Sequence, residues 1–132
     1  MIRNRWPHNR LHDSIDIEIR NRASIMRVRT IEDRVLRKLF LGFMQIHILH
    51  HAAQEPIYGL WMLEELAHHG YRLSAGMLYP LLHSLENQGL LSREDRLVDG
   101  KIRKYYTTTS RGLHVLAEAR QKASQLFQEI TD

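Results

Sequence analysis

The sequence between Leu73 and Leu91 limits the fold more than any other part of the chain. Leucines recur here at the i, i+3, i+4 and i+7 spacing of a helix with one buried side: Leu78, Leu81, Leu82 and Leu85. Ser74 is a favourable N-cap residue before this pattern, and Gly89 supplies a left-handed residue after it. We therefore predict a helix that opens at Ser74 and packs its leucine face into a core.

The other side of this predicted helix carries no lysine or arginine. Its residues are small, aromatic or able to form hydrogen bonds: Ala75, Gly76, Tyr79, Pro80, His83 and Asn87. A helix face that meets only water is usually rich in charged residues, so this composition indicates another role. Without long charged side chains, the face can approach a groove closely.

A β-hairpin is predicted directly after this helix. Residues 91–98 and 101–108 flank Asp99-Gly100, a dipeptide that favours a two-residue type I′ turn. Strand alternation divides the basic and aromatic side chains of the second strand between two faces: Lys101, Arg103 and Tyr105 on one, Lys104 and Tyr106 on the other. An ordinary charged edge hairpin is the alternative interpretation.

Together, these segments resemble the PadR family of winged-helix transcriptional regulators. The resemblance rests on the run Leu78-Tyr79-Pro80-Leu81-Leu82-His83-Ser84-Leu85-Glu86, on Gly89-Leu90-Leu91, and on a hairpin ending in Arg103-Lys104-Tyr105-Tyr106. It covers roughly Leu36 to Leu116 and implies a mainly α fold with a small β-hairpin. That fold is a winged helix-turn-helix followed by a C-terminal dimerisation helix. Only one helix is predicted after the hairpin, so the chain resembles the short C-terminal subgroup.

Three parts are predicted along the chain. Residues 1–29 form a basic N-terminal arm, 30–109 the winged helix-turn-helix DNA-binding domain, and 110–132 the dimerisation helix. Within the domain, a long first helix ends near His51. The second helix runs from Tyr58 to His69, and four of its residues are expected to face inward: Leu60, Leu63, Leu66 and Ala67. The family usually has His-Gly-Tyr at its start, where this chain has Tyr58-Gly59-Leu60.

The net charge of +4 is unevenly distributed. The first 30 residues hold seven arginines and three carboxylates, a difference that accounts for the whole net charge. The remaining chain is neutral, so a DNA-binding surface has to come from local clustering of cations. We expect the arm either to contact DNA phosphates or to be a disordered tail, and Met26 is an alternative start that would leave the arm out of the protein.

Composition also excludes several classes of protein. The chain has no cysteine, which excludes disulfides and thiolate metal sites and fits a reducing cytoplasm. No apolar run reaches the length of a membrane span, so we expect a cytoplasmic protein with no membrane partner. The size of 132 residues indicates one domain with a modest core, which a second subunit would help to complete.

Nine histidines raise the question of a metal site. His47 and His51 are one helical turn apart, and His68-His69 lie in the next predicted helix. No third ligand with supporting residues is evident from the sequence, so we predict neither a metal nor a cofactor. The sequence has no nucleophile elbow, phosphate loop or HExxH motif, so we also predict that the protein is not an enzyme.

The family resemblance implies a homodimeric regulator, usually a repressor, on double-stranded DNA at a pseudo-palindromic promoter site. Three sets of residues follow from it. The expected DNA contacts on the helix are Ser74, Ala75, Met77, Tyr79, Pro80 and His83. The expected DNA contacts on the hairpin, or wing, are Lys101, Arg103 and Lys104. The expected dimer contacts are Leu116, Leu126 and Phe127, because the family pairs its last helix with the first helix of the other subunit.

Other functions stay open at this point. The neutral domain also fits a winged-helix protein-interaction module that does not bind DNA. A second alternative is a sensor with a small-molecule effector in the dimer cleft, although the tryptophan that some family members use on the last helix is missing. A third is a circadian period-modifying regulator of the PadR type. The family often has arginine or lysine at the position of Ser84, so a phosphate contact is not expected there.

Overall fold

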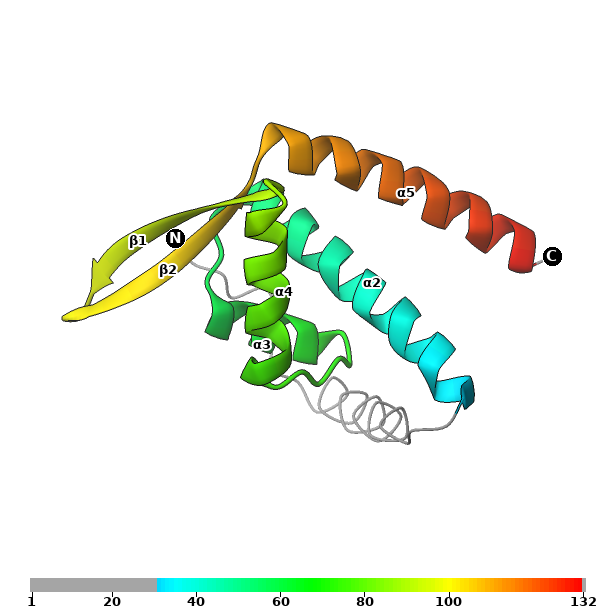
Figure 1. Ribbon diagram of the computed structural model, residues 1–132, viewed down its shortest axis with the longest axis horizontal. Helices are drawn as coiled ribbons and strands as arrows, with labels where there is room; N and C mark the ends of the chain where they lie inside the picture. Colours follow the sequence, from blue (N-terminus) through cyan, green and yellow to red (C-terminus); the bar gives the residue numbers. More distant parts are fainter. Residues whose placement is uncertain (1–30, 132) are drawn as a thin grey trace.

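The computed structural model describes residues 31–131, and the predicted basic arm lies outside this range. The described chain is mainly helical, with one antiparallel hairpin, as predicted (Figure 1). Its elements are α2 (Ile31–Gln54), α3 (Gly59–His68), α4 (Ala75–Asn87), β1 (Leu91–Val98), β2 (Lys101–Thr108) and α5 (Ser110–Ile130). Among the helices of this range, none combines the length and apolarity needed to cross a bilayer.

Three helices enclose the core. The leucine face of α4 is buried as predicted at Leu78, Leu82 and Leu85, while Leu81 lies at the edge of the core. The partners of these leucines on the other two helices are fully buried: Met44 and Ile48 on α2, and Met62 and Leu66 on α3. Burying each such side chain contributes about 1.5–3 kcal/mol to folding. This core fixes how α4 lies on α2 and α3.

The prediction that Leu60 faces inward is wrong. Its side chain is 56% exposed, whereas Trp61 and Met62 are buried. The inward face of α3 is set by Met62 and Leu66, which are one turn apart. Leu60 precedes Met62 by two residues, a rotation of about 200° around the helix axis, and therefore faces away from the core.

The hairpin is anchored at its base and extends away from the helices at its tip (Figure 1). Asp99 and Gly100 have φ values of 51° and 78°, the two positive values that a type I′ turn requires. At the base, the N–H of Ile57 donates to the Tyr106 carbonyl (3.0 Å) and the N–H of Tyr106 donates to the Ile57 carbonyl (2.7 Å). Ile57 is thus joined to β2. The side chain of its partner, Tyr106, is buried.

The start of α5 is fixed by Thr109, its N-cap. The Thr109 hydroxyl accepts a hydrogen bond from the Gly112 N–H (3.0 Å) and donates one to the Gly89 carbonyl (2.6 Å). Gly89 has a φ of 76°, as predicted for the residue that ends α4. One threonine therefore joins the end of α4 to the beginning of α5.

Candidate nucleic-acid interface

The predicted helix face is exposed along α4. Ser74 occupies the N-cap position with extended backbone, although its side chain makes no capping hydrogen bond. Five of the six residues predicted to contact DNA on this helix are exposed: Ser74, Ala75, Tyr79, Pro80 and His83. The sixth, Met77, is half-buried and lies on the flank of the face. The exposed face carries no formal charge, so a polar surface could approach it without displacing a bulky cation.

Tyr79 is held in place by the start of α3. A Cβ atom added to Gly59 would lie 2.6 Å from Tyr79 Cε1 and 2.8 Å from its hydroxyl oxygen, far closer than van der Waals contact. The ring therefore lies directly on the Gly59 backbone. Tyr79 is nevertheless 43% exposed, so one side of the ring is fixed by α3 while the rest faces solvent.

The wing carries a cluster of stacked basic and aromatic side chains, which the sequence did not reveal. The Arg103 guanidinium lies over the Tyr58 ring, with Cζ 4.1 Å from the ring centroid. Tyr58 also meets the edge of the Tyr105 ring at 5.5 Å, and Arg96 covers Tyr105 at 4.4 Å. The two cation–π contacts attract each guanidinium to a ring and restrict the arginine rotamers. Arg103 is thus positioned before any ligand arrives.

The cations of the two strands differ in their surroundings. On β1, Arg93 lies 3.4 Å from Asp95, and Arg96 lies 3.1 Å from Glu94. On β2, Lys101 and Lys104 are exposed, and no carboxylate within residues 31–131 forms an ion pair with either. The available positive charge of the hairpin therefore lies on β2, at Lys101, Arg103 and Lys104. The Arg103 side chain also hydrogen-bonds Tyr105, and this contact raises the pKa of Arg103.

The predicted dimer residues lie in two different environments. Leu126 and Phe127 are exposed on α5, at 51% and 65%. Leu116 is only 2% exposed because it packs into the core of its own chain, which leaves Leu126 and Phe127 as the accessible members of the set. The periodicity of α5 could not separate these cases because both positions belong to apolar stripes on one helix.

Comparison with known proteins identifies the family of the chain. The model of the Transcriptional regulator PadR-like family matches residues 48–118, which run from the last two turns of α2 through α3, α4 and the hairpin into α5. The chain belongs to the PadR-like family. The resemblance drawn from the α4 and hairpin residues is thereby confirmed, and this PadR-like protein is a member of a family of transcriptional regulators.

Individual relatives cover most of the chain. Transcriptional regulator Rv3488 of Mycobacterium tuberculosis is 44% identical over 95 residues, spanning 72% of this chain and 89% of that protein. A PadR family transcriptional regulator from Eggerthella lenta DSM 2243 is 34% identical with a TM-score of 0.60, covering 75% of this chain and 91% of that one. The PadR-like regulator BC4206 of Bacillus cereus is 28% identical with a TM-score of 0.62, covering 74% and 92%.

Replacing Gly59 by alanine should displace Tyr79. The added methyl group cannot share the space of the ring, so we expect a loss of stability of about 1–3 kcal/mol. The loss should shrink markedly in a Tyr79→Ala background, where the ring is gone. Chemical denaturation of the four proteins in this double-mutant cycle measures the coupling. The matched control is Gly76→Ala, also in a helix. Within residues 31–131, its added Cβ would meet only Ser74 Oγ, at 3.7 Å. Equal losses in both backgrounds would contradict the contact.

Proposed function

We propose that this PadR-like protein is a homodimeric repressor that binds a pseudo-palindromic DNA site sequence-specifically. The observation that carries the proposal is the pairing of an exposed, uncharged α4 face with a wing whose β2 strand presents Lys101, Arg103 and Lys104. The α4 helix leads directly into the hairpin and packs against β1. The position of the α4 face relative to the wing is therefore fixed.

The wing and the α4 face would have different roles in DNA binding. Cations on the wing neutralise phosphates, which supplies affinity and salt dependence but no sequence information. The α4 face would enter the major groove, where side chains read base edges. Tyr79 and His83 are the larger polar groups of that face, and Tyr79 is held on the Gly59 backbone. A fixed side chain loses less entropy on binding than a mobile one.

Exposure of the terminal helix supports the homodimer. Every residue of α5 from Arg120 onward is exposed in the single chain, including the apolar Leu126, Phe127 and Ile130. The N-terminal half of α2 also exposes large apolar side chains: Val35, Leu36 and Leu39. Both helix halves project from the same side of the domain, away from the wing (Figure 1). A second copy of the chain would cover these side chains and remove them from water.

Neutralising the wing should reduce the salt dependence of DNA binding. If Lys101, Arg103 and Lys104 each contact one phosphate, each alanine variant should lower the slope of log affinity against log salt by about one unit. Folding stability should hardly change for the two lysines, because exposed charges contribute little. The matched control is Lys122→Ala, an exposed cation on α5. Fluorescence anisotropy over a salt series measures the slope, and unchanged slopes in all three wing variants would contradict the wing contact.

Sequence preference should depend on α4. Selection from a random DNA pool should enrich a two-fold site whose half-sites lie about 10 base pairs apart, one helical turn, so that two α4 helices can face one side of the duplex. Tyr79→Ala and His83→Ala should weaken the selected site more than random DNA. Asn87→Ala, at the far end of the exposed face, is the comparison variant. If no site is enriched and binding to random DNA is also absent, the protein-interaction alternative gains support.

Adding charge to α5 should prevent dimer formation. Phe127→Glu would place a carboxylate in the proposed apolar interface, so the dissociation constant should rise by at least 100-fold, since an unpaired buried charge costs several kcal/mol. The matched control, Gln125→Glu, adds the same charge to an exposed polar position two residues earlier. Sedimentation velocity at micromolar concentrations separates monomer from dimer. A monomeric wild-type protein, or an unchanged dimer of Phe127→Glu, would contradict the proposed interface.

A further inference from the structure

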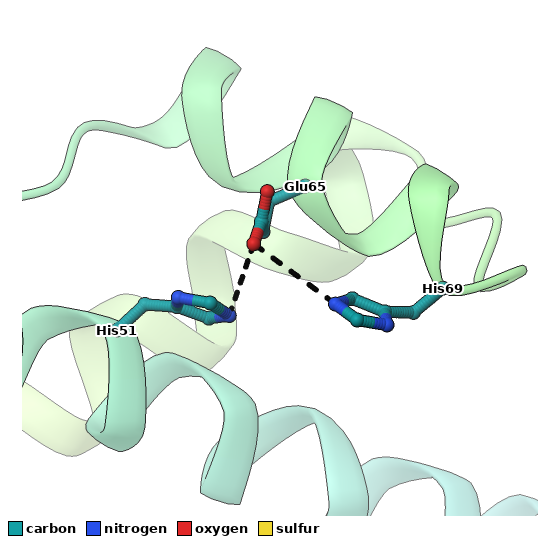
Figure 2. A group of neighbouring side chains, drawn as sticks. All are labelled: His51, Glu65 and His69. Atoms are coloured by element: carbon teal, nitrogen blue, oxygen red, sulfur yellow. Dashed lines mark ion pairs between the residues drawn. The ribbon is translucent and has the colours of Figure 1, made fainter. Parts of the chain in front are cut away.

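Three side chains with metal-binding chemistry meet where α2 packs against α3. His51 lies near the end of α2, Glu65 lies within α3, and His69 follows the last residue of α3 (Figure 2). Glu65 Oε1 is 3.3 Å from His51 Nε2 and 3.9 Å from His69 Nε2. One ligand atom of each residue lies within 4.8 Å of the other two. Sequence inspection missed Glu65, although its i, i+4 spacing from His69 was the available signal.

We propose that His51, Glu65 and His69 bind a divalent transition-metal ion, with Zn²⁺, Co²⁺ and Ni²⁺ as the suitable class. Two imidazole nitrogens and one carboxylate oxygen form a ligand set that suits these ions. Mg²⁺ and Ca²⁺ prefer six or more oxygen ligands, so nitrogen-rich sites select against them. The site would supply three protein ligands and leave one position for water.

The distances fit such an ion with a small adjustment. Metal–ligand bonds of about 2.0–2.2 Å in a tetrahedron place neighbouring ligand atoms about 3.4 Å apart. The His51–Glu65 pair already has this separation, at 3.3 Å. No pair exceeds 4.8 Å, so none has to close by more than about 1.4 Å. The side chain of His69 is 38% exposed and can move by rotation about its side-chain bonds without disturbing the core.

Ring contacts hold both imidazoles near the required orientation. The His51 ring meets Trp61 edge to face, with centroids 5.4 Å apart and an interplanar angle of 74°. The His69 ring stacks on His47 at 5.4 Å and 25°. Packing that fixes ligand orientation is typical of metal sites. It leaves the imidazole Nε2 atoms of His51 and His69 on the side of Glu65.

Burial adds a reason for a cation between these residues. Glu65 is 3% exposed and His51 is 5% exposed. A carboxylate inside a protein is costly unless a positive charge lies beside it. A proton on His51 would supply one charge and give a buried ion pair, whereas a divalent ion would supply two and engage His69 as well. The two states differ in whether His69 is needed, which makes His69 the residue to test.

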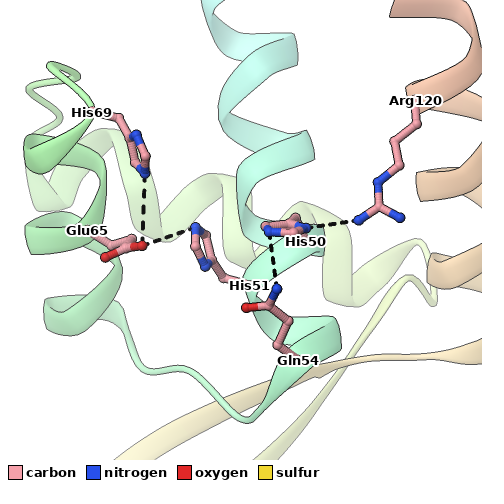
Figure 3. A network of polar contacts seen from close by, with 6 residues as sticks. All are labelled: His50, His51, Gln54, Glu65, His69 and Arg120. Atoms are coloured by element: carbon pink, nitrogen blue, oxygen red, sulfur yellow. Dashed lines mark hydrogen bonds and ion pairs between the residues drawn. The ribbon is translucent and has the colours of Figure 1, made fainter. Parts of the chain in front are cut away.

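A bound ion would connect α3 to the part of α2 that also holds α5. The residue next to His51 is His50, whose Nδ1 lies 2.9 Å from Arg120 Nη2 of α5 (Figure 3). Its Nε2 lies 3.3 Å from the Gln54 side chain. Adjacent residues of one turn therefore contact α5 on one side and α3 on the other. Metal binding should stiffen this junction, which a higher melting temperature would report.

The test measures metal directly and does not depend on DNA. Untagged protein, stripped with a chelator, would be dialysed against Zn²⁺ and, separately, Co²⁺, and the bound metal quantified. We expect one ion per chain, a visible Co²⁺ absorption band of a four- or five-coordinate site, and a higher melting temperature with Zn²⁺ than with Mg²⁺. A wild-type chain that binds no ion at micromolar concentrations would overturn the proposal. Loss of DNA binding alone would not.

Variants locate the ion. His69→Ala changes an exposed side chain and should reduce affinity for Zn²⁺ at least tenfold and abolish the Co²⁺ band, while Glu65→Gln should do the same if it folds. His68→Ala removes the neighbouring histidine, and His114→Ala removes an exposed one on α5; both should retain the ion. Unchanged binding in His69→Ala would overturn the site. Equal losses of metal affinity in His68→Ala and His69→Ala would also overturn it, because they would indicate non-specific binding to histidines.

Discussion

The paired hydrogen bonds between Ile57 and Tyr106 are the contact on which the two exposed surfaces depend. They fix the chain beside β2 just before α3 begins. The next residue, Tyr58, then lies beneath the Arg103 guanidinium, and the one after it, Gly59, lies beneath the Tyr79 ring. Three consecutive residues thus contact the base of the hairpin, the wing and α4. A shift of one residue here would place a side chain against Tyr79 and remove the platform under Arg103.

The α2 helix has a comparable role on the other side of the molecule. Its buried face contributes Met44 and Ile48 to the core, and its last two turns contact both α3 and α5. His50 and His51 are adjacent in sequence, yet about 100° separates them around the helix axis. One residue is therefore directed to Arg120 and the other to Glu65. A single turn of α2 therefore contacts both α3 and α5.

Most of the fold could be predicted from local signals. The spacing of Leu78, Leu82 and Leu85, the N-cap at Thr109 and the Asp99-Gly100 turn each determine structure within a few residues, and the structure agrees with them. The orientation of Leu60 was predicted wrongly and the burial of Leu116 was not predicted, because several faces of α3 and α5 are apolar and only packing decides which one is buried. Apolar periodicity shows which faces of a helix can be buried, but it does not predict which of them is buried.

The candidate sites were harder to predict because their residues come from distant parts of the chain. The exposed α4 face could be read from one helix. The contact between Tyr58 and Arg103, and the meeting of His51 with Glu65, require the tertiary arrangement of separate elements. Charge counts alone also could not show that the β1 arginines are paired with carboxylates while the β2 lysines have no such pair within the described residues.

Joining Ile57 to Tyr106 also has a kinetic consequence. The contact closes a loop of about fifty residues, which costs about 3–4 kcal/mol of chain entropy before any contact compensates it. Within that loop, α3, α4 and the hairpin can form through shorter-range contacts. The junction at residues 57–59 should therefore assemble late on the folding pathway. Substitutions that weaken it should accelerate unfolding more than they slow folding.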